Sequence, residues 1–173
     1  ALNSSGYKIT NITDITPLIG IEPSAILTFR DEYIRLADDV NSAKIIAKNT
    51  FTIEEFLKNE FEKGNIRTNQ FTTEKKSIKI HGHATFSILN IPENYSPTIM
   101  NTGCCGMAGS FGYEKEHYKI SMQVGEDTLF PKIRNISKET EIIASGTSCR
   151  HQILDGTNRH AKHPITVLRE ALI

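Results

Sequence analysis

The chain has 173 residues, and its 20 Lys and Arg balance its 20 Asp and Glu, so the formal net charge at pH 7 is zero. This balance argues against binding to nucleic acid or to a membrane surface through bulk charge. No apolar run approaches the roughly 20 residues that span a bilayer, so we expect no transmembrane segment. We expect no signal peptide either, because no apolar core of that kind opens the chain.

The first half of the chain predicts short strands alternating with helices. The expected elements are strands at 7–12 and 17–21 and helices at 23–37, 43–47 and 53–64. The strand at 17–21 is apolar on both faces, as in a buried parallel sheet. Pro23 suits the first position of a helix, and Thr52-Ile53-Glu54-Glu55 is a capping-box pattern.

The second half repeats this alternation. The expected elements are strands at 77–81, 98–101 and 141–144 and helices at 85–89, 113–134, 149–154 and 164–172. Strands alternating with helices predict an α/β, layered Rossmann-like fold with a mainly parallel sheet flanked by helices. In such sheets ligands bind beyond the carboxyl ends of the strands.

Three cysteines, two of them adjacent, give the chain its most specific chemistry. An odd number of this kind does not form a disulfide framework, and clustered thiols in a reducing compartment are more often ligands or redox groups. We therefore expect a cytoplasmic protein, or one held peripherally at the inner face of the membrane.

Cys104 and Cys105 lie in a run of small residues at 103–112. Adjacent side chains on an extended backbone point to opposite faces, so both thiols can serve one centre only if the backbone bends. Glycines allow that bend and leave N–H groups free to donate to sulfur or to an anion. The expected backbone cradle is Gly103, Gly106, Gly109 and Gly112. Cys149 lies in a second turn, and both turns follow strands, which indicates one shared site.

These residues allow several kinds of centre. Adjacent cysteines suit zinc poorly, because its tetrahedral sites normally use spaced pairs. An iron–sulfur cluster can accept neighbouring cysteines on different irons, and a single iron is a further option. A redox-active Cys104/Cys105 pair requires a strained peptide. Buried cysteines that pack only as small apolar residues are the structural alternative.

The histidines add candidate ligands. His81 and His83 alternate at a strand end and face opposite sides, so one of them can aim at a given centre. His151 follows Cys149 by two residues and points either to the centre or to the backbone. We place His117 on the surface of a helix. A basic patch before the last helix comprises Arg159, His160, Lys162 and His163. We expect a solvated helix start there, and a site for an anion or a partner is the alternative.

The run Gly103-Cys104-Cys105-Gly106-Met107-Ala108-Gly109-Ser110-Phe111-Gly112-Tyr113-Glu114 resembles the cysteine-rich Cys-Cys-Gly domain family. That family includes the B subunit of heterodisulfide reductase, glycolate oxidase iron–sulfur subunits and anaerobic glycerol phosphate dehydrogenase subunits. Together with segments 125–131, 146–152 and 163–164, the run resembles the C-terminal domain of fused FAD-linked D-lactate or D-2-hydroxyglutarate dehydrogenases with iron–sulfur modules.

The resemblance implies an electron-transfer domain in which Cys104, Cys105 and Cys149 ligate a 4Fe-4S cluster or a metal. His81, His83 or His151 would lie in or next to the ligand shell. FAD would bind elsewhere in the parent polypeptide, and the partners would be its flavin and ferredoxin-like modules and an electron acceptor. The fragment alone is then expected to be inactive. We also expect two pseudo-repeated halves, a degenerate one at 1–76 and one at 77–173 that carries all three cysteines.

The sequence departs from this pattern in four places. Glu22-Pro23-Ser24-Ala25 stands where relatives carry C-x-x-C, and Gln152 stands where a second cysteine would follow Cys149. Relatives also continue His-Gly-His into Cys-His-Gln, whereas His83 is followed directly by Ala84, and the connection after Asp14 is shorter. We expect that segments with one ligand are missing from the sequence at these two places. These losses favour a second hypothesis, a degenerate structural or docking domain without a metal, and a small thiol-redox enzyme is the third.

Overall fold

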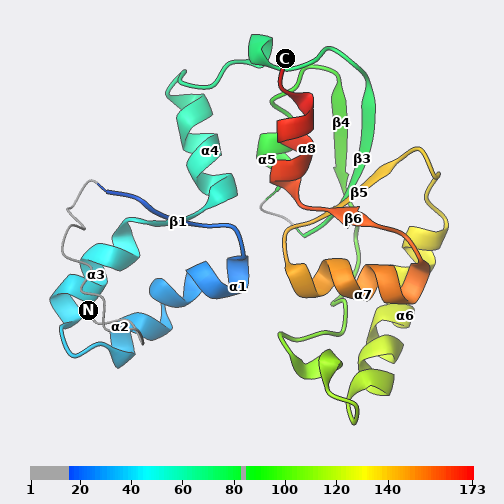
Figure 1. Cartoon of the computed structure of the whole chain (residues 1–173), viewed down its shortest axis with the longest axis horizontal. Helices are drawn as coiled ribbons and strands as arrows, with labels where there is room; N and C mark the ends of the chain where they lie inside the picture. Colours follow the sequence, from blue (N-terminus) through cyan, green and yellow to red (C-terminus); the bar gives the residue numbers. More distant parts are fainter. Residues whose placement is uncertain (1–15, 83–84) are drawn as a thin grey trace. The chain divides into compact units, whose positions relative to one another are not determined.

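The structure, a computed structural model shown in Figure 1, describes residues 16–82 and 85–173. The chain divides into two compact units, Ala1–Phe56 and Leu57–Ile173, which are described separately. The strand expected at 7–12, the short connection after Asp14 and the candidate ligand His83 lie outside the described residues. The assignment of 1–76 and 77–173 as two pseudo-repeated halves stays a prediction.

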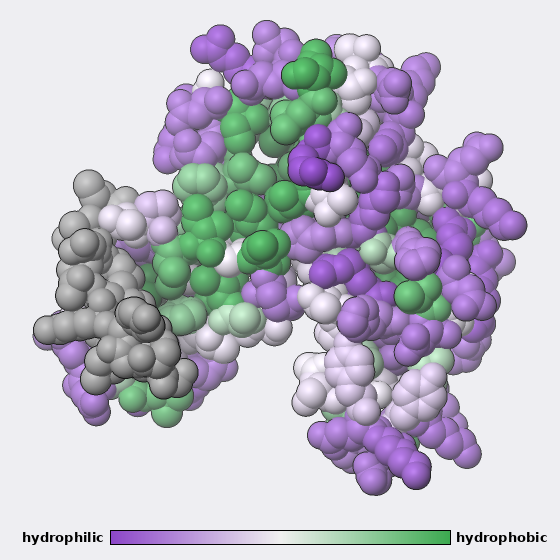
Figure 2. Space-filling model, in the orientation of Figure 1, coloured by the Kyte–Doolittle hydropathy of each residue, from purple (hydrophilic) through white to green (hydrophobic). Residues whose placement is uncertain are grey.

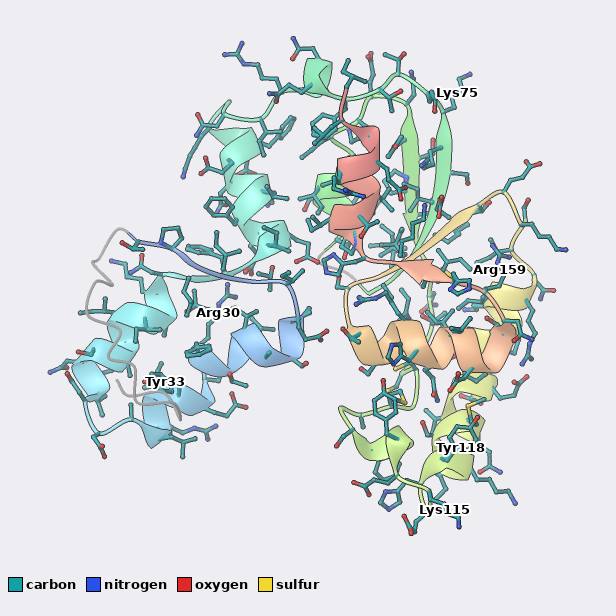
Figure 3. The ribbon with its side chains drawn as sticks, viewed as in Figure 1. Arg30, Tyr33, Lys75, Lys115, Tyr118 and Arg159 are labelled. Carbon is teal, nitrogen blue, oxygen red and sulfur yellow. The ribbon has the colours of Figure 1, made fainter. Side chains whose placement is uncertain are left out.

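In its described residues, 16–56, the first unit contains one pair of parallel strands and several short helices. Its elements are β1 (Leu18–Gly20), α1 (Pro23–Ile26), η1 (Leu27–Phe29), α2 (Glu32–Leu36), α3 (Val40–Lys48), β2 (Thr50–Thr52) and the start of α4 (Ile53–Glu62). The helix expected at 23–37 is three short pieces. Arg30, labelled in Figure 3, lies at the break, where its guanidinium donates to the Thr50 carbonyl and to the Glu55 carboxylate. These contacts hold the break against β2.

The capping box predicted at the start of α4 is confirmed. Thr52 N–H donates to Glu55 Oε2 over 2.9 Å, and Glu55 N–H donates to Thr52 Oγ1 over 3.3 Å. Each side chain thereby satisfies a backbone donor that the first helical turn leaves without a partner.

The second unit is built on a four-stranded parallel sheet in the order β4-β3-β5-β6. Its strands are β3 (Lys76–His81), β4 (Tyr95–Ile99), β5 (Glu141–Ala144) and β6 (Ala161–Lys162), and its helices are α5 (Phe86–Leu89), α6 (Tyr118–Arg134), α7 (Thr147–Thr157) and α8 (Pro164–Ala171), with short η2 (Thr68–Gln70) and η3 (Phe111–Tyr113). The α/β prediction of parallel strands flanked by helices is confirmed. The two-residue strand β6 was not expected.

The sheet separates two apolar cores, because alternate residues of each strand face opposite sides. On β5, Ile143 packs with α5 and α8, whereas Ile142 and Ala144 pack with α6 and α7. Each core residue of β5 is at most 1% exposed. The unit is therefore a three-layer α/β/α arrangement, with α7 lying across α6 in Figure 1.

The surface of the second unit also carries apolar side chains. Figure 2 shows apolar residues gathered in the region of α4 and α8, where Leu57, Ile66, Phe71, Leu168 and Leu172 line an open cavity of about 380 Å³. Among the described residues, no helix combines the length and the apolar character that crossing a membrane requires.

Candidate metal centre

Three metal-ligating side chains meet at the carboxyl edge of the parallel sheet. His81 is the last residue of β3, Cys105 lies in the turn that follows β4, and Cys149 lies in the first turn of α7, directly after β5. Strands β4 and β5 both pair with β3, so the central strand contributes the histidine and its two neighbours lead to the thiols. The chain passes from β3 to β4 on one side and then crosses back to β5. Ligands bind at such switch points in open α/β sheets.

The donor atoms of His81, Cys105 and Cys149 all lie within 4.8 Å of one another. The two sulfur atoms are 3.3 Å apart, although their residues are separated by 44 positions in the chain. Cys105 is 4% exposed, and His81 and Cys149 are half-buried. The group therefore lies at the edge of the core, with access from solvent on one side.

A hydrogen bond fixes the orientation of the His81 ring. Its Nδ1 lies 2.8 Å from the hydroxyl of Thr102, three residues beyond β4. A ligating histidine typically engages its second ring nitrogen in this way, which holds the ring and tunes the basicity of the other nitrogen. With Nδ1 engaged by Thr102, Nε2 is the nitrogen left for a metal. No local pattern in the sequence indicates this role of Thr102.

The surroundings of Cys105 stabilise its thiolate. The Cys149 thiol makes the largest contribution by donating to Cys105, while burial opposes ionisation. His81 and the Met107 N–H also donate, and together these groups lower the pKa of Cys105 to about 4. Cys149 itself lies in the first turn of the 11-residue helix α7, where the helix dipole favours negative charge. The thiolate, which is the metal-binding form, is therefore stabilised at Cys105.

The bend predicted after the adjacent cysteines occurs at Gly106. Its φ is +97°, and a Cβ there would lie 2.1 Å from the Ser121 carbonyl oxygen, so this position requires glycine. Gly106 N–H donates to Cys104 Sγ over 3.3 Å. The bend buries Cys105 and leaves Cys104 exposed. Cys104 is not a member of the three-residue group.

The other expected cradle glycines have different roles. Gly103 N–H donates to Thr128 Oγ1 on α6 over 2.9 Å. Gly109 has a φ of +72° with open space around it, whereas a Cβ at Gly112 would meet Ser121 Oγ at 2.3 Å. The glycines therefore shape the turn and pack it on α6.

His151 makes a side-chain contact that the sequence did not suggest. Its Nδ1 lies 2.5 Å from Tyr113 Oη, and the two rings meet edge to face with centroids 6.0 Å apart. Partial burial, followed by the negative charges of Asp155 and Cys105, raises the pKa of Tyr113. Tyr113 therefore lies close enough to Cys105 for the charge of that thiolate to contribute.

His117 and His163 make structural contacts, and the placement of His117 is corrected. His117 precedes α6 at its N-cap position instead of lying inside the helix, because residues 111–113 form η3 and α6 starts at Tyr118. His117 stacks on Phe111 and contacts Glu114.

The helix start expected at the basic patch is only partly found, because His163 is the N-cap of α8 whereas Lys162 belongs to β6, and the Lys and Arg side chains of the patch are engaged. His163 Nδ1 accepts from Ile165 N–H at the start of α8. Lys162 pairs with Glu141 and Glu170, and Arg159, labelled in Figure 3, donates to the carbonyls of residues 136, 137 and 140.

The positions noted as departures carry no thiol. Gln152 is 1% exposed, and its Nε2 donates to Ser121 Oγ over 2.8 Å, which ties α7 to α6. Glu22 precedes α1 and accepts from Ser24 Oγ. All three cysteines belong to the second unit.

The donor set fits a single tetrahedral ion. Two thiolates at about 2.3 Å from one zinc or iron ion lie about 3.8 Å apart, close to the observed sulfur separation and within the spread of the group. A 4Fe-4S cluster takes four cysteine ligands, on different irons. The described group supplies two thiols and an imidazole and does not complete that set.

Fold and site together define an α/β domain with a Cys/His group at the carboxyl edge of a parallel sheet. No family model matches the chain, and no solved structure matches it. Among curated proteins it is similar to the D-2-hydroxyglutarate dehydrogenases of Pantoea ananatis (23% identity over 167 residues) and Pseudomonas putida (26% over 156 residues). These matches cover 90% and 88% of this chain but only 16% and 15% of the relatives.

A second kind of relative matches a shorter stretch. The C subunit of the anaerobic glycerol-3-phosphate dehydrogenase of Escherichia coli is 35% identical over 83 residues, which is 48% of this chain and 20% of that protein. The chain thus spans about one sixth to one fifth of the curated relatives, and it is similar to a domain-sized part of dehydrogenases.

Proposed function

We propose that this chain is a metal-binding electron-transfer domain, corresponding to the C-terminal domain of a D-2-hydroxy-acid dehydrogenase of the D-2-hydroxyglutarate type. The convergence of His81, Cys105 and Cys149 at the switch point of the sheet carries the proposal. Similarity to dehydrogenases over nine tenths of the chain supports the choice of parent enzyme.

In this proposal His81 Nε2 and the two thiolates hold the metal. A bound iron would supply one-electron chemistry. Thr102 orients the imidazole, and the Met107 N–H and the α7 N-terminus stabilise negative charge on sulfur. Neither FAD nor the hydroxy acid is assigned to this chain, and both belong to other modules of the parent polypeptide. The chain by itself would not oxidise the substrate.

The nature of the metal group follows from the ligand count. Three donors leave a fourth position open, as in many single-ion sites. A 4Fe-4S cluster would need further ligands, for which the one remaining thiol of the chain is exposed Cys104, two residues before Gly106 on the same turn. A single iron is therefore the form that the described donors support best, and the cluster is the alternative.

The second candidate function is a docking domain without a metal. Gln152 forms a hydrogen bond in the core, and residues 16–56 contain no cysteine. Both observations favour the docking domain, because the chain then has fewer cysteine ligands than the Cys-Cys-Gly family that it resembles. In this case the three donors would be retained for packing only.

Anaerobic reconstitution of the full-length protein with ferrous iron and sulfide distinguishes these functions. Iron bound without acid-labile sulfide supports the single-ion centre, and equal amounts of iron and sulfide support the cluster. Cys105→Ser should lose either form. Absence of metal from this domain in the wild type would discard electron transfer here and leave the docking function. Steady-state turnover of Cys149→Ser should then equal that of the wild type.

A further inference from the structure

The three thiols of the chain are unequally placed. Cys105 Sγ and Cys149 Sγ are 3.3 Å apart, whereas the sequence neighbour Cys104 is exposed and accepts from Gly106 N–H. The sequence alone suggests Cys104 and Cys105 as the redox pair, which would strain the peptide between them. The fold instead brings together two thiols from turns after different strands, and no such local strain arises.

We propose that Cys105 and Cys149 form a reversible disulfide that closes the metal site to metal. The inference that oxidation controls metal binding rests on the proposed function, since the same two sulfur atoms are the proposed metal ligands. Formation requires the sulfur atoms to approach by about 1.2 Å, to the usual bond length of about 2.05 Å. Cys105 lies in the turn after β4 and Cys149 in the first turn of α7, so this approach is confined to the carboxyl edge of the sheet.

The surroundings favour attack by Cys105 and resolution by Cys149. Cys105 Sγ lies among hydrogen-bond donors, since His81 and the Met107 N–H donate to it, and Cys149 Sγ lies 3.3 Å away. Cys149 is half-buried and lies within contact distance, so it can resolve an oxidised Cys105 without rearrangement of the strands.

The burial of Cys105 selects the class of oxidant. With 4% of its surface exposed, Cys105 admits a small molecule such as hydrogen peroxide more readily than a bulky disulfide. The Cys105 thiolate attacks one peroxide oxygen, the O–O bond breaks, and hydroxide leaves, giving a sulfenic acid at Cys105. Cys149 sulfur then attacks Cys105 sulfur, and the oxygen leaves as water with the Cys149 proton. The two thiols lose two electrons, and the peroxide gains them.

The disulfide and the metal exclude each other, because a sulfur in a disulfide has no thiolate charge to donate to a metal. Bound metal protects Cys105 and Cys149 from peroxide, and the disulfide prevents metal from binding. A thiol reductant reverses the block. Oxidative conditions would thereby disconnect this domain from electron flow without unfolding it.

The test uses the full-length protein freed of metal and reduced, in the wild type and in a Cys104→Ser background. After a few equivalents of hydrogen peroxide, mass spectrometry of non-reduced peptides should show a Cys105–Cys149 cross-link in both proteins, reversed by dithiothreitol. In Cys149→Ser, Cys105 should instead be trapped as a sulfenic acid that dimedone labels. Cross-links that involve Cys104, or Cys105 remaining available to iodoacetamide, would overturn the proposal.

A parallel experiment with zinc distinguishes failure of the disulfide from failure of the proposed metal centre. Zinc added before peroxide should slow cross-linking at least tenfold, and the oxidised protein should not bind zinc. Zinc binding by the reduced protein without any cross-link would overturn the disulfide and leave the metal centre intact. Zinc binding that persists after complete cross-linking would overturn the mutual exclusion. A cross-link in a protein that binds no metal when reduced supports the disulfide and removes the metal centre.

Discussion

Thr102 decides which nitrogen of His81 is available for a metal, since its hydroxyl engages Nδ1 at 2.8 Å. We predict that Thr102→Val weakens metal binding 10- to 100-fold, the usual effect of removing a group that orients a ligating histidine. A competition titration with a chromophoric chelator measures it. Thr98→Val is the matched control, because the Thr98 hydroxyl donates to the Ile78 carbonyl on the same pair of strands. Equal affinities of the two variants would contradict the role of Thr102.

Gly106 is the residue on which the shape of the cysteine turn depends. We predict that Gly106→Ala lowers the free energy of unfolding by about 3 kcal/mol, because overpacking against the Ser121 carbonyl adds to the strain of a positive φ. Gly109→Ala serves as the control, since Gly109 shares the positive φ but has open space around it, and its cost should be about 1 kcal/mol. Urea denaturation followed by circular dichroism compares them, and equal costs would show that the Ser121 contact is unimportant.

At this scale the sequence predicted the bend and the participation of cysteine, but it did not predict which cysteines meet. Cys104 is exposed and Cys105 is buried, and no local pattern reveals which of the two adjacent thiols faces the core. The selection of His81 depends on Thr102, which is 21 residues away in the chain. The partnership of Tyr113 with His151 is equally nonlocal.

Glu55 stabilises the first turn of helix α4, because its carboxylate completes the capping box and pairs with Arg30. Hydrogen bonds from Arg30, and then from Thr52, lower the pKa of Glu55. A carboxylate with a lowered pKa adds stability that is fully present above its unfolded pKa and is lost as the pH falls through its folded pKa. Its contribution is therefore present at pH 7 and fades below about pH 4.5.

We predict that Glu55→Gln lowers the free energy of unfolding at pH 7 by about 1 kcal/mol, a modest value because the pair is partly exposed. The gap between variant and wild type should narrow towards pH 3. Urea denaturation at several pH values measures it, beside Glu62→Gln, whose surface pair with Lys58 should be worth less than about 0.5 kcal/mol. A gap that does not change with pH would contradict the account of Glu55.

Elements were predictable where local signals are strong. The capping box starts α4, and the apolar runs at β3 and β5 match the observed strands within one residue. Strand β4 begins three residues earlier than expected and contains Pro97, which an edge strand tolerates. Strand β6 has only two residues, too few for a pattern, and depends on pairing with β5.

In the second unit, the order of the strands in the sheet determines which side chains meet at the candidate metal centre. His81, Cys105 and Cys149 meet because β3 lies between β4 and β5, an order that the alternation of strands and helices does not specify. The sequence predicted that both cysteine turns lie at the carboxyl edge, and the structure confirms this. Long-range pairing determines which turns are neighbours, so the composition of the site required the fold.

The most direct measurement is a cobalt titration of the reduced protein under anaerobic conditions. Cobalt bound by two thiolates and an imidazole gives sulfur-to-metal absorption in the near ultraviolet and intense visible bands typical of tetrahedral sites. We predict saturation at one equivalent, loss of these bands in Cys105→Ser and Cys149→Ser, and their retention in Cys104→Ser, with circular dichroism confirming that each variant is folded. Absence of the bands in the wild type, or their loss in Cys104→Ser alone, would contradict a metal centre formed by His81, Cys105 and Cys149.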